Sequence, residues 1–429
     1  MGLLLAAVYP WRCAAANLLV YSTNDSGAGS LRQAIADNAT MGGGNTIMFS
    51  NIVTGTIRLT TGELLINNDV TILGPGAWKL AVDGNATSRV FHIGTNFSAN
   101  ISSLTITNGA GLAGGGLYVD QAFLTLSNCI VSGNLATNGG GIYINGRQSA
   151  SLAILANSTL SGNFARSAAG AIFNDGSSMG VAQLEMRNCT VSSNSASGGV
   201  GGIYNFAPNG DAEALILDTT FSGNSGNGAG GILNFAAMFP ATVQMGNTIL
   251  KAGVSGPNLA NGGVAAFISY GYNLCSDNGS GLLTNATDQL NTDPLLGPLR
   301  DNGGPTPTMA PSPNSPAIDK GNSSGLTTDQ RGAPRPFDFP SIANASGGDG
   351  SDIGAFELGS PLLSITSIPP NVIVSWPSFY GDFSLESVTM LSGANNWSSV
   401  GNVPAAIGAR YNVTNVTPTG NTFYRLKSR

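Results

Sequence analysis

Few residues in this sequence combine the types and the spacing that chemistry on a bound substrate requires. Hydrolysis of a glycosidic bond uses paired carboxylates, but the chain contains no DD dipeptide and only an isolated NTD phrase at Asn291. The single histidine, His92, lies in the alternating run RVFHI, and no GxSxG phrase supplies a serine nucleophile for it. We therefore interpret His92 as a structural strand residue and predict no catalytic residue.

Metal and cofactor sites are not indicated by the sequence either. Behind the N-terminal segment 1–16, the cysteines Cys129, Cys189 and Cys275 are odd in number and form no CxxC pair. The string GAGLAG from Gly109 formally matches a dinucleotide-binding loop, but the strand-like phrase GGLYVD follows it where a helix is required. We predict no metal and no cofactor.

The composition favours strands and turns over surface helices. Charged residues make up only 9% of the chain, whereas 60 of its 429 residues are glycine; about 25% charged residues is usual in globular proteins. The net charge of −6 and the absence of a basic cluster exclude nucleic acid as an expected partner.

The N-terminal segment 1–16 has the pattern of a secretory signal peptide. The opening MGLLLAAVYPWRCAAANLLV places an apolar run before small residues at 14–16, although the basic start of such a signal is missing. A buried strand is the alternative interpretation. No segment reaches the roughly 20 apolar residues that cross a membrane, so we expect no transmembrane span. The expected location is secreted or at the cell surface, extracellular or on the outer membrane.

A sequence repeat organises the middle of the chain. Its four strong copies begin at Leu124, Leu152, Leu184 and Leu215. Each copy contains an SGN-like phrase and a glycine cluster, and the asparagine of this phrase recurs at nearly equal intervals. A constant period of this kind indicates a solenoid. The asparagines of the phrase are Asn134, Asn163, Asn194 and Asn224.

Each copy holds three short alternating runs separated by Gly and Asn clusters, which predicts three strands per turn. A leucine-rich repeat is the near competitor, but its helical return segment is missing, so we predict a parallel β-helix. Equivalent residues then stack about 4.8 Å apart, and the four SGN-type asparagines become a structural ladder. The expected core column is Leu126, Leu155, Met186 and Leu217. Cys129 and Cys189, two turns apart, are expected to be free thiols because that spacing exceeds disulfide reach.

One column of aromatic residues suggests a binding surface. If Ile142, Ile172 and Ile203 point into the coil, the aromatic residue after each points outward, where an exposed ladder could stack sugar rings. The opposite facing, with the aromatics inside, remains the alternative. The residues of this predicted carbohydrate-binding column are Tyr118, Tyr143, Phe173 and Tyr204.

The repeat phrases also carry a resemblance. GGIY, AGAIFN and FSGN resemble those of bacterial right-handed parallel β-helix surface proteins with repeats of the polymorphic outer-membrane protein type. STNDSGAGSLRQAIADNA, from Ser22, resembles the motif that opens many exported solenoids. Within it, Ser30 and Gln33 form a capping box, and Leu31, Ala34 and Ile35 give a short helix one apolar face. We expect this helix to lie across the open end of the solenoid.

Two further regions follow the repeats. From Thr292 to Glu357, phrases such as TDQRGAPRP and SDIGAFE resemble the choice-of-anchor Q region of such proteins, and we interpret its mixed charges as structural ion pairs. The C-terminal segment 361–429, with Trp376 and Trp397 as expected core aromatics, resembles a fibronectin-like β-sandwich module.

The sequence thus predicts an all-β chain: a right-handed parallel β-helix of the pectin lyase-like type and a small C-terminal β-sandwich. The expected organisation is a signal peptide at 1–16, a cap at 17–44, the β-helix at 45–290, an anchor-type region closing the solenoid at 291–360 and the β-sandwich at 361–429. The expected function is that of an exported, non-enzymatic surface protein in adhesion or matrix interaction, with polysaccharide or cell-envelope components as partners. The alternative is a polysaccharide lyase or glycoside hydrolase of the β-helix class.

Overall fold

The computed structural model describes residues 15–359 without a gap and, beyond them, residues 361, 363–378, 380, 383–391, 396–408, 410–416 and 420–428. The expected signal peptide at 1–16 therefore lies outside the described residues, except for its last two positions.

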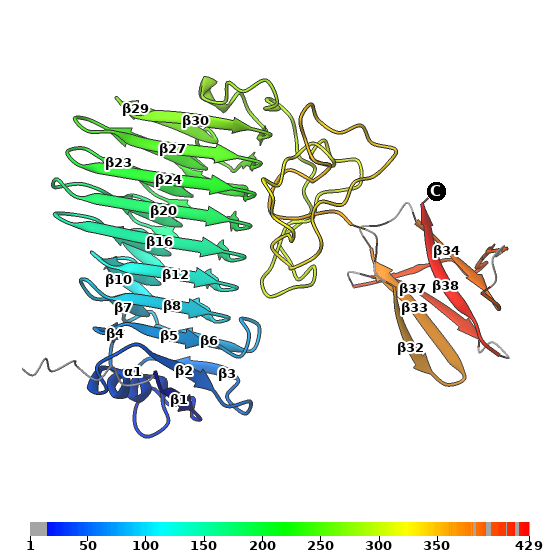
Figure 1. Cartoon of the computed structure of the whole chain (residues 1–429), viewed down its shortest axis with the longest axis horizontal. Helices are drawn as coiled ribbons and strands as arrows, with labels where there is room; N and C mark the ends of the chain where they lie inside the picture. The colour runs from blue at the N-terminus through cyan, green and yellow to red at the C-terminus, as the bar shows by residue number, and fades with distance from the viewer. Residues whose placement is uncertain are drawn as a thin grey trace, which may run out of the picture.

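From Asn17 to Cys275 the chain winds into a parallel β-helix, with three long sheets that run along its axis (Figure 1). Sheet A contains β1 (Asn17–Val20), β2 (Asn45–Phe49), β5 (Val70–Leu73), β8 (Ser98–Ser102), β12 (Phe123–Ser127), β16 (Ala150–Ala156), β20 (Val181–Arg187), β24 (Asp211–Leu217), β27 (Ala241–Gly246) and β30 (Ala266–Gly271). Sheet B contains β3 (Gly55–Arg58), β6 (Leu80–Asp83), β9 (Thr105–Thr107), β13 (Ile130–Ser132), β17 (Thr159–Ser161), β21 (Thr190–Ser192), β25 (Thr220–Gly226), β28 (Ile249–Ala252) and β31 (Leu274–Cys275). Sheet C contains β4 (Leu64–Ile66), β7 (Phe91–Ile93), β11 (Leu117–Asp120), β15 (Ile142–Asn145), β19 (Ile172–Asp175), β23 (Ile203–Ala207), β26 (Ile232–Ala236) and β29 (Leu259–Gly263). A short fourth row of β10 (Ala110–Ala113), β14 (Leu135–Asn138), β18 (Phe164–Ala165) and β22 (Ser195–Ala196) joins sheet B at β25. The predicted all-β fold class is confirmed.

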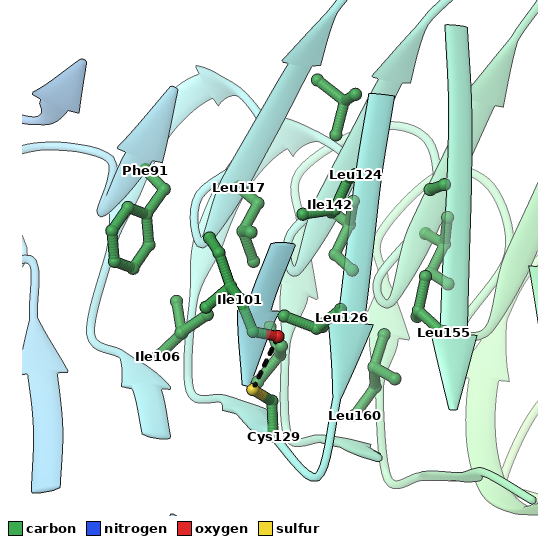
Figure 2. Packing of buried hydrophobic residues seen from close by; sticks show 14 of the residues in the cluster. Phe91, Ile101, Ile106, Leu117, Leu124, Leu126, Cys129, Ile142, Leu155 and Leu160 are labelled. Carbon is green, nitrogen blue, oxygen red and sulfur yellow. Dashed lines mark hydrogen bonds between the residues drawn. The ribbon is translucent and has the colours of Figure 1, made fainter. Parts of the chain in front are cut away.

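Alternation along each strand builds the core of the solenoid. The inward residues are aliphatic or aromatic and almost fully buried, and they stack turn on turn (Figure 2). Leu126, Leu155 and Met186 share one inward column as predicted, but the register pairs Met186 with Ile216 rather than with Leu217. Leu217 pairs with Arg187 instead. In the last copy, the inward residue of this column is therefore Ile216, one position before the predicted Leu217.

A column of asparagines sits at the turn between sheets A and B because the backbone there is left-handed. Asn128, Asn157, Asn188 and Asn247 have φ between 49° and 53°, and Asp218 takes the same place with φ of 49°. Asn and Asp tolerate this region better than other residues with a Cβ. The residue type at this corner is therefore fixed by backbone conformation.

The two ends of the solenoid are closed differently. Helix α1 (Leu31–Thr40) begins at Ser30, whose Oγ accepts a hydrogen bond from Gln33 N at 3.1 Å, and its buried face of Leu31, Ala34 and Ile35 joins the solenoid core as predicted. Gln33 completes no capping box, since its side chain donates to Asp37. At the far end, Leu283 joins the same core, just after the 3₁₀ turn Gly279–Gly281 (η1). None of the described helices is long and apolar enough to cross a membrane.

The region at 291–360 was expected to close the solenoid, but its described residues, 291–359, lie along the flank of the solenoid and are termed the flank region (Figure 1). They contact the outward-facing residues of sheet B. Thr159 Oγ1 donates to Pro307 O at 2.6 Å, and Thr190 Oγ1 donates to Gln330 Oε1 at 2.6 Å. Ile249 and Leu274, further along the same sheet, pack against Ala317 and Ile353. The solenoid end is therefore covered by the segment before this region.

Two small antiparallel sheets form the C-terminal unit. One contains β32 (Ser364–Ile368), β33 (Asn371–Pro377), β37 (Arg410–Val416) and β36 (Ala405–Ile407); the other contains β35 (Ser398–Ser399), β34 (Phe383–Val388) and β38 (Phe423–Ser428). Trp376 is 1% exposed in their shared core, as expected, whereas Trp397 is partly exposed beneath the guanidinium of Arg425. Ala310, Ile318, Phe356 and Leu358 of the flank region belong to the same core.

Candidate functional site

The predicted aromatic column lies on the outer side of sheet C. The register pairs Tyr118 with Tyr143, Tyr143 with Phe173, and Phe173 with Tyr204. Successive ring centroids lie 5.0 to 5.6 Å apart. The isoleucines beside these residues are completely buried in the solenoid core. The aromatic side chains therefore project away from that core.

Projecting outward does not leave this column exposed. Tyr143 and Phe173 are each only 6% exposed, and Tyr118 and Tyr204 are partly buried. Ala169, from the turn that precedes β19, is buried with them. The remaining buried members of this outer cluster are Ala168, Val200 and Ala229. The expected exposure of Tyr143 and Phe173 was therefore wrong, because a second apolar layer covers the middle of the column.

At the N-terminal end of the same column, the structure brings together five polar residues that sequence reasoning treated separately or did not single out. His92 pairs with Tyr118 across β7 and β11, and their rings lie 5.0 Å apart. Glu63 is the residue before β4, and its Oε1 atom lies 2.9 Å from His92 Nδ1. Asp120 Oδ2 lies 3.8 Å from His92 Nε2. These four residues and Arg89 are termed the His92 cluster. The stacking of short strands brings its members together from different turns. None of them forms a recognisable motif in the sequence, so sequence patterns alone could not have grouped them.

The His92 cluster fixes one tautomer of the imidazole. A carboxylate only accepts hydrogen bonds, so the 2.9 Å contact with Glu63 Oε1 places a proton on His92 Nδ1. The hydrogen bond from His92 holds the pKa of Glu63 below its usual range. In neutral His92, Nε2 is then a free acceptor, which is the form that a general base needs. Nε2 has no hydrogen-bond partner, but it is also buried from solvent.

The cationic member of the cluster is held by the protein itself. Arg89 Nη1 donates to Glu63 Oε2 at 2.6 Å, and its other nitrogens donate to the carbonyls of Ala113 and Gly114 at 2.7 to 3.0 Å. Its guanidinium lies 4.6 Å from the centroid of the Tyr118 ring. Arg89 is therefore committed to internal contacts rather than directed at a substrate.

The tyrosines of the column are poor proton donors and acceptors in this setting. Burial, together with the nearby carboxylate of Asp120, raises the pKa of Tyr118 to about 12. Asn145 Nδ2 donates to the Tyr118 hydroxyl at 2.9 Å and to Asp120 Oδ1 at 2.6 Å. Tyr143 donates to Asp175, and burial raises its pKa further. Both hydroxyls therefore stay protonated and hydrogen-bonded within the protein.

The SGN-type asparagines form a continuous chain of amides inside the solenoid. Asn134 Nδ2 donates to Asn163 Oδ1, Asn163 Nδ2 to Asn194 Oδ1, and Asn194 Nδ2 to Asn224 Oδ1, each at 2.9 Å. The same oxygens also accept from the backbone N–H of the preceding asparagine. All four side chains are at most 2% exposed.

The glycine clusters beside this chain have a spatial explanation. A Cβ at Gly140 would lie 2.5 Å from the carbonyl oxygen of Phe164 in the next turn. The cluster therefore permits one coil to pass close to another. It offers no phosphate-binding loop at the start of a helix.

One buried guanidinium, that of Arg335, pairs with a carboxylate of the flank region and with a carboxylate of the solenoid. Arg335 Nε donates to Glu357 Oε2 at 2.8 Å, and Arg335 Nη1 lies 3.3 Å from Asp218 Oδ1 of the solenoid. All three side chains are at most 1% exposed. Arg331 pairs with Asp329 at 2.7 Å. The prediction of structural ion pairs here is confirmed, and the Arg335–Asp218 pair joins the flank region to the solenoid.

The thiols of the three described cysteines are unreactive because they are buried and protonated. Cys129, Cys189 and Cys275 are free and buried, and burial raises the pKa of each to about 12. Among the described residues, no three His, Cys, Asp or Glu side chains gather as metal ligands would.

No family model matches this chain, and no curated protein is similar to it in sequence. The fold alone defines its class: it is a parallel β-helix protein with an antiparallel C-terminal unit.

Proposed function

We propose that the protein is an exported, non-enzymatic surface or extracellular protein, which acts in adhesion or in binding to matrix or cell-envelope carbohydrate. One observation carries the non-enzymatic part of this proposal: the only unpartnered nitrogen of His92 is buried, so no substrate atom reaches it in this arrangement. A general base has to come within hydrogen-bond reach of the proton that it removes.

The rigid construction of the molecule supports a scaffold role. Stacked amides run through the coil, and the buried Arg335–Asp218 pair joins the coil to the flank region. The flank region in turn shares one apolar core with the C-terminal sheets. A solenoid built in this way presents an elongated surface without needing to move. The resemblance to repeats of the polymorphic outer-membrane protein type supports the surface location.

The test of the leading proposal has two measurements. The native cells are fractionated, and the protein is expected in the envelope or the medium; recovery in the cytoplasm would contradict export. The purified full chain is then incubated with isolated envelope polysaccharide, and co-sedimentation without any change in polymer length is expected.

The second candidate is a polysaccharide lyase or glycoside hydrolase, and the His92 cluster is the observation that favours it. Glu63 and Asp120 flank one imidazole on a partly exposed face, as acid–base chemistry on a sugar would need. Uronic-acid polysaccharides, assayed for new reducing ends and for the absorbance of unsaturated products, separate the two candidates. Activity that is lost in His92→Gln and kept in Arg166→Gln would establish the enzyme, whereas no activity in the unaltered chain supports the scaffold.

A further inference from the structure

Five turns that connect sheet C to sheet A form one edge of the coil, on the side away from the flank region (Figure 1). They lie at residues 146–149, 176–180, 208–210, 237–240 and 264–265. Their exposed apolar side chains are termed the corner ridge: Met179 is 71% exposed, Met238 76%, Phe239 39% and Val264 67%. At about 4.8 Å per coil, the ridge extends over roughly 14 Å along the solenoid.

Backbone hydrogen bonds between successive coils hold these turns in place. Met179 N donates to Asn209 O at 2.9 Å, and Val264 N donates to Ala236 O at 2.9 Å. The ridge side chains therefore project from a backbone that the neighbouring coils support.

Local conformation does not explain the methionine in the turn 176–180. Ser178 and Met179 have φ of 60° and 63°, in the left-handed region that Asn and Gly occupy with least strain. The side chain of Met179 gains no burial in return, because it is largely exposed. A residue that raises the conformational energy without packing into the protein is a candidate for contact with a partner.

The turn at residues 237–240 has an unusual composition for an exposed segment. It reads AMFP, and all four of its residues are exposed. Contact between apolar side chains and water is unfavourable, so protein surfaces avoid such runs unless the run has a function. The next connecting turn along the coil adds Val264, which extends the apolar surface to the last strand of sheet A. Exposed apolar surface of this kind marks contact with another molecule or with a membrane.

The charge at this edge suits the headgroup region of a zwitterionic lipid. Arg147 is the only charged residue in the five turns; it is exposed, and its Nη2 donates to Ser178 Oγ at 3.4 Å. The carboxylates of the adjoining strands are less accessible, since Asp175 is buried and Asp211 is partly buried. A guanidinium beside the ridge binds a lipid phosphate well. The net charge of −6 disfavours a strongly anionic surface.

The shape of the ridge favours a bilayer over a protein partner. The apolar side chains stand on turns at the edge of the coil, so the surface is convex, and a protein would need a complementary groove to cover it. A bilayer needs no such groove, because its acyl chains adapt to the side chains that enter them. The flank region lies on the opposite side of the coil and leaves this edge open to a flat surface (Figure 1).

We propose that the corner ridge is a lipid-contact site, through which the coil lies along the surface of a zwitterionic bilayer. Its four apolar side chains enter the boundary between headgroups and acyl chains, and Arg147 contacts lipid phosphate. The contact is peripheral and reversible, since even one complete acyl chain gives only marginal membrane binding. The choice of a membrane rests in part on the proposed surface location, whereas the exposed apolar side chains are features of the fold.

The test is flotation of the full chain with phosphatidylcholine vesicles. Saturable binding is expected, and the double variant Met238→Ser, Phe239→Ser should weaken it about tenfold or more, because it removes the burial of two large apolar side chains. The matched control is Leu112→Ser, Val254→Ser; these residues are 80% and 96% exposed and lie outside the ridge. The control should bind like the unaltered chain. Every protein in the comparison carries the same segment 1–16, so a difference between variants reports the ridge.

A second measurement locates the contact on the molecule. Phe239→Trp should lose fluorescence on vesicles of phosphatidylcholine brominated in its acyl chains, because the indole then lies close to the bromine atoms. Val254→Trp should lose no more than the unaltered chain, whose four tryptophans set the background. If thermal unfolding shows that the double serine variant is not folded, this quenching decides.

Three outcomes would overturn the proposal: no binding of the unaltered chain to vesicles, equal binding by the ridge and control variants, or equal quenching at positions 239 and 254. Sedimentation equilibrium tests a second copy of the chain as the partner. Self-association that the double ridge variant abolishes, without any binding to vesicles, would assign the ridge to contact between copies and would also overturn the lipid site.

The fate of the proposed function is separable from that of the ridge. Failure to bind vesicles refutes the lipid site, but export and retention of polysaccharide are measured independently and are unaffected. Recovery of the protein in the cytoplasm, together with ridge-dependent binding to vesicles, would contradict the proposed function and support the lipid site.

Discussion

At the scale of single residues, the middle asparagines of the ladder use all of the hydrogen-bonding capacity of their side chains inside the protein. Asn163 Oδ1 accepts from the backbone and the side chain of Asn134, and its Nδ2 donates to Val131 O and to Asn194 Oδ1. Such residues are required because a turn that lies inside the coil has no water to satisfy its polar groups. Their repetition in the sequence therefore reflects stacking rather than ligand binding.

Replacing Asn163 by Ala should lower the free energy of unfolding by about 2–4 kcal/mol, because it strands the amide of Asn134 and the carbonyl of Val131 in a dry interior. Asn227→Ala is the matched control, since Asn227 is exposed and makes one bond, to Ser197 O; about 0.5 kcal/mol is expected there. Denaturant unfolding followed by circular dichroism measures both. Similar losses in the two variants would refute the structural importance of the ladder.

At the scale of elements, the outer face of sheet C behaves as a second core. The aromatic residues of β15 and β19 stand on the outside of the coil but are covered by alanines and by Val200 from the turns before the strands. A solenoid turn thus buries side chains on both faces of one sheet. The column is explained by packing, and its buried rings are not available to stack sugars.

Phe173→Ala should cost about 3–5 kcal/mol in the free energy of unfolding, because it empties a space inside this outer cluster. Phe164→Ala, on the neighbouring strand β18, removes an equal ring that is 36% exposed and should cost clearly less. Thermal unfolding compares the two. Phe173→Ala unfolding no earlier than Phe164→Ala would mean that the outer layer is loosely packed and open to ligands.

At the scale of the whole molecule, a buried ionic cluster joins parts of the chain that are far apart in sequence. Arg335 and Asp218 are 117 residues apart, yet their side chains meet between the flank region and the solenoid. Removing one partner of a buried pair leaves the other charge unpaired and out of water. The guanidinium therefore adds a buried ionic contact to the hydrogen bonds of Thr159 and Thr190 and the apolar contacts of Ile249 and Leu274 that attach the flank region.

Arg335→Met should lower the free energy of unfolding by about 3–5 kcal/mol and should release residues 291–360 from the solenoid. Limited proteolysis followed by mass spectrometry is expected to show new cuts in this region while the coil stays intact. Arg166→Met, on the exposed surface, should change neither. An unchanged cleavage pattern in Arg335→Met would show that the apolar contacts of Ile249 and Leu274 hold the region by themselves.

The same cluster predicts a dependence of stability on pH. Burial raises the pKa of Asp218 to about 6 despite the neighbouring Arg335, from an ordinary value of 3.8. Burial raises the pKa values of Glu357 and Asp352 as well. Three carboxylates thus share the single positive charge of Arg335. Between pH 3.8 and about 6 the folded chain holds a proton on Asp218 that the unfolded chain has released.

The contribution of Asp218 to stability therefore falls as pH rises through that window, by about 3 kcal/mol at most. Asp218→Asn cannot ionise, so this variant should lose less stability than the unaltered chain between pH 4 and pH 6. Denaturant midpoints at several pH values measure the difference. Parallel curves for the two proteins would show that Asp218 is already ionised at the lower pH.

The sequence by itself determined the repeat, the parallel β-helix, the capping helix and the stacking of the SGN-type asparagines. These features are local and periodic: each turn of the coil places equivalent residues one strand apart, so a column in the alignment is a column in space. The same regularity indicated that the aromatic residues of sheet C and the isoleucines beside them face opposite ways, but it left open which of the two points into the coil.

Only the tertiary structure decided what covers those residues and where the rest of the chain lies. Tyr143 and Phe173 are buried because turns outside the strand pattern fold over them. The fold of the flank region places Arg335 against Asp218. In the His92 cluster, Glu63, Arg89 and Asp120 come together from different turns. Periodicity specifies which residues share one side of a sheet, but burial depends on contacts between segments whose spacing in the sequence follows no period.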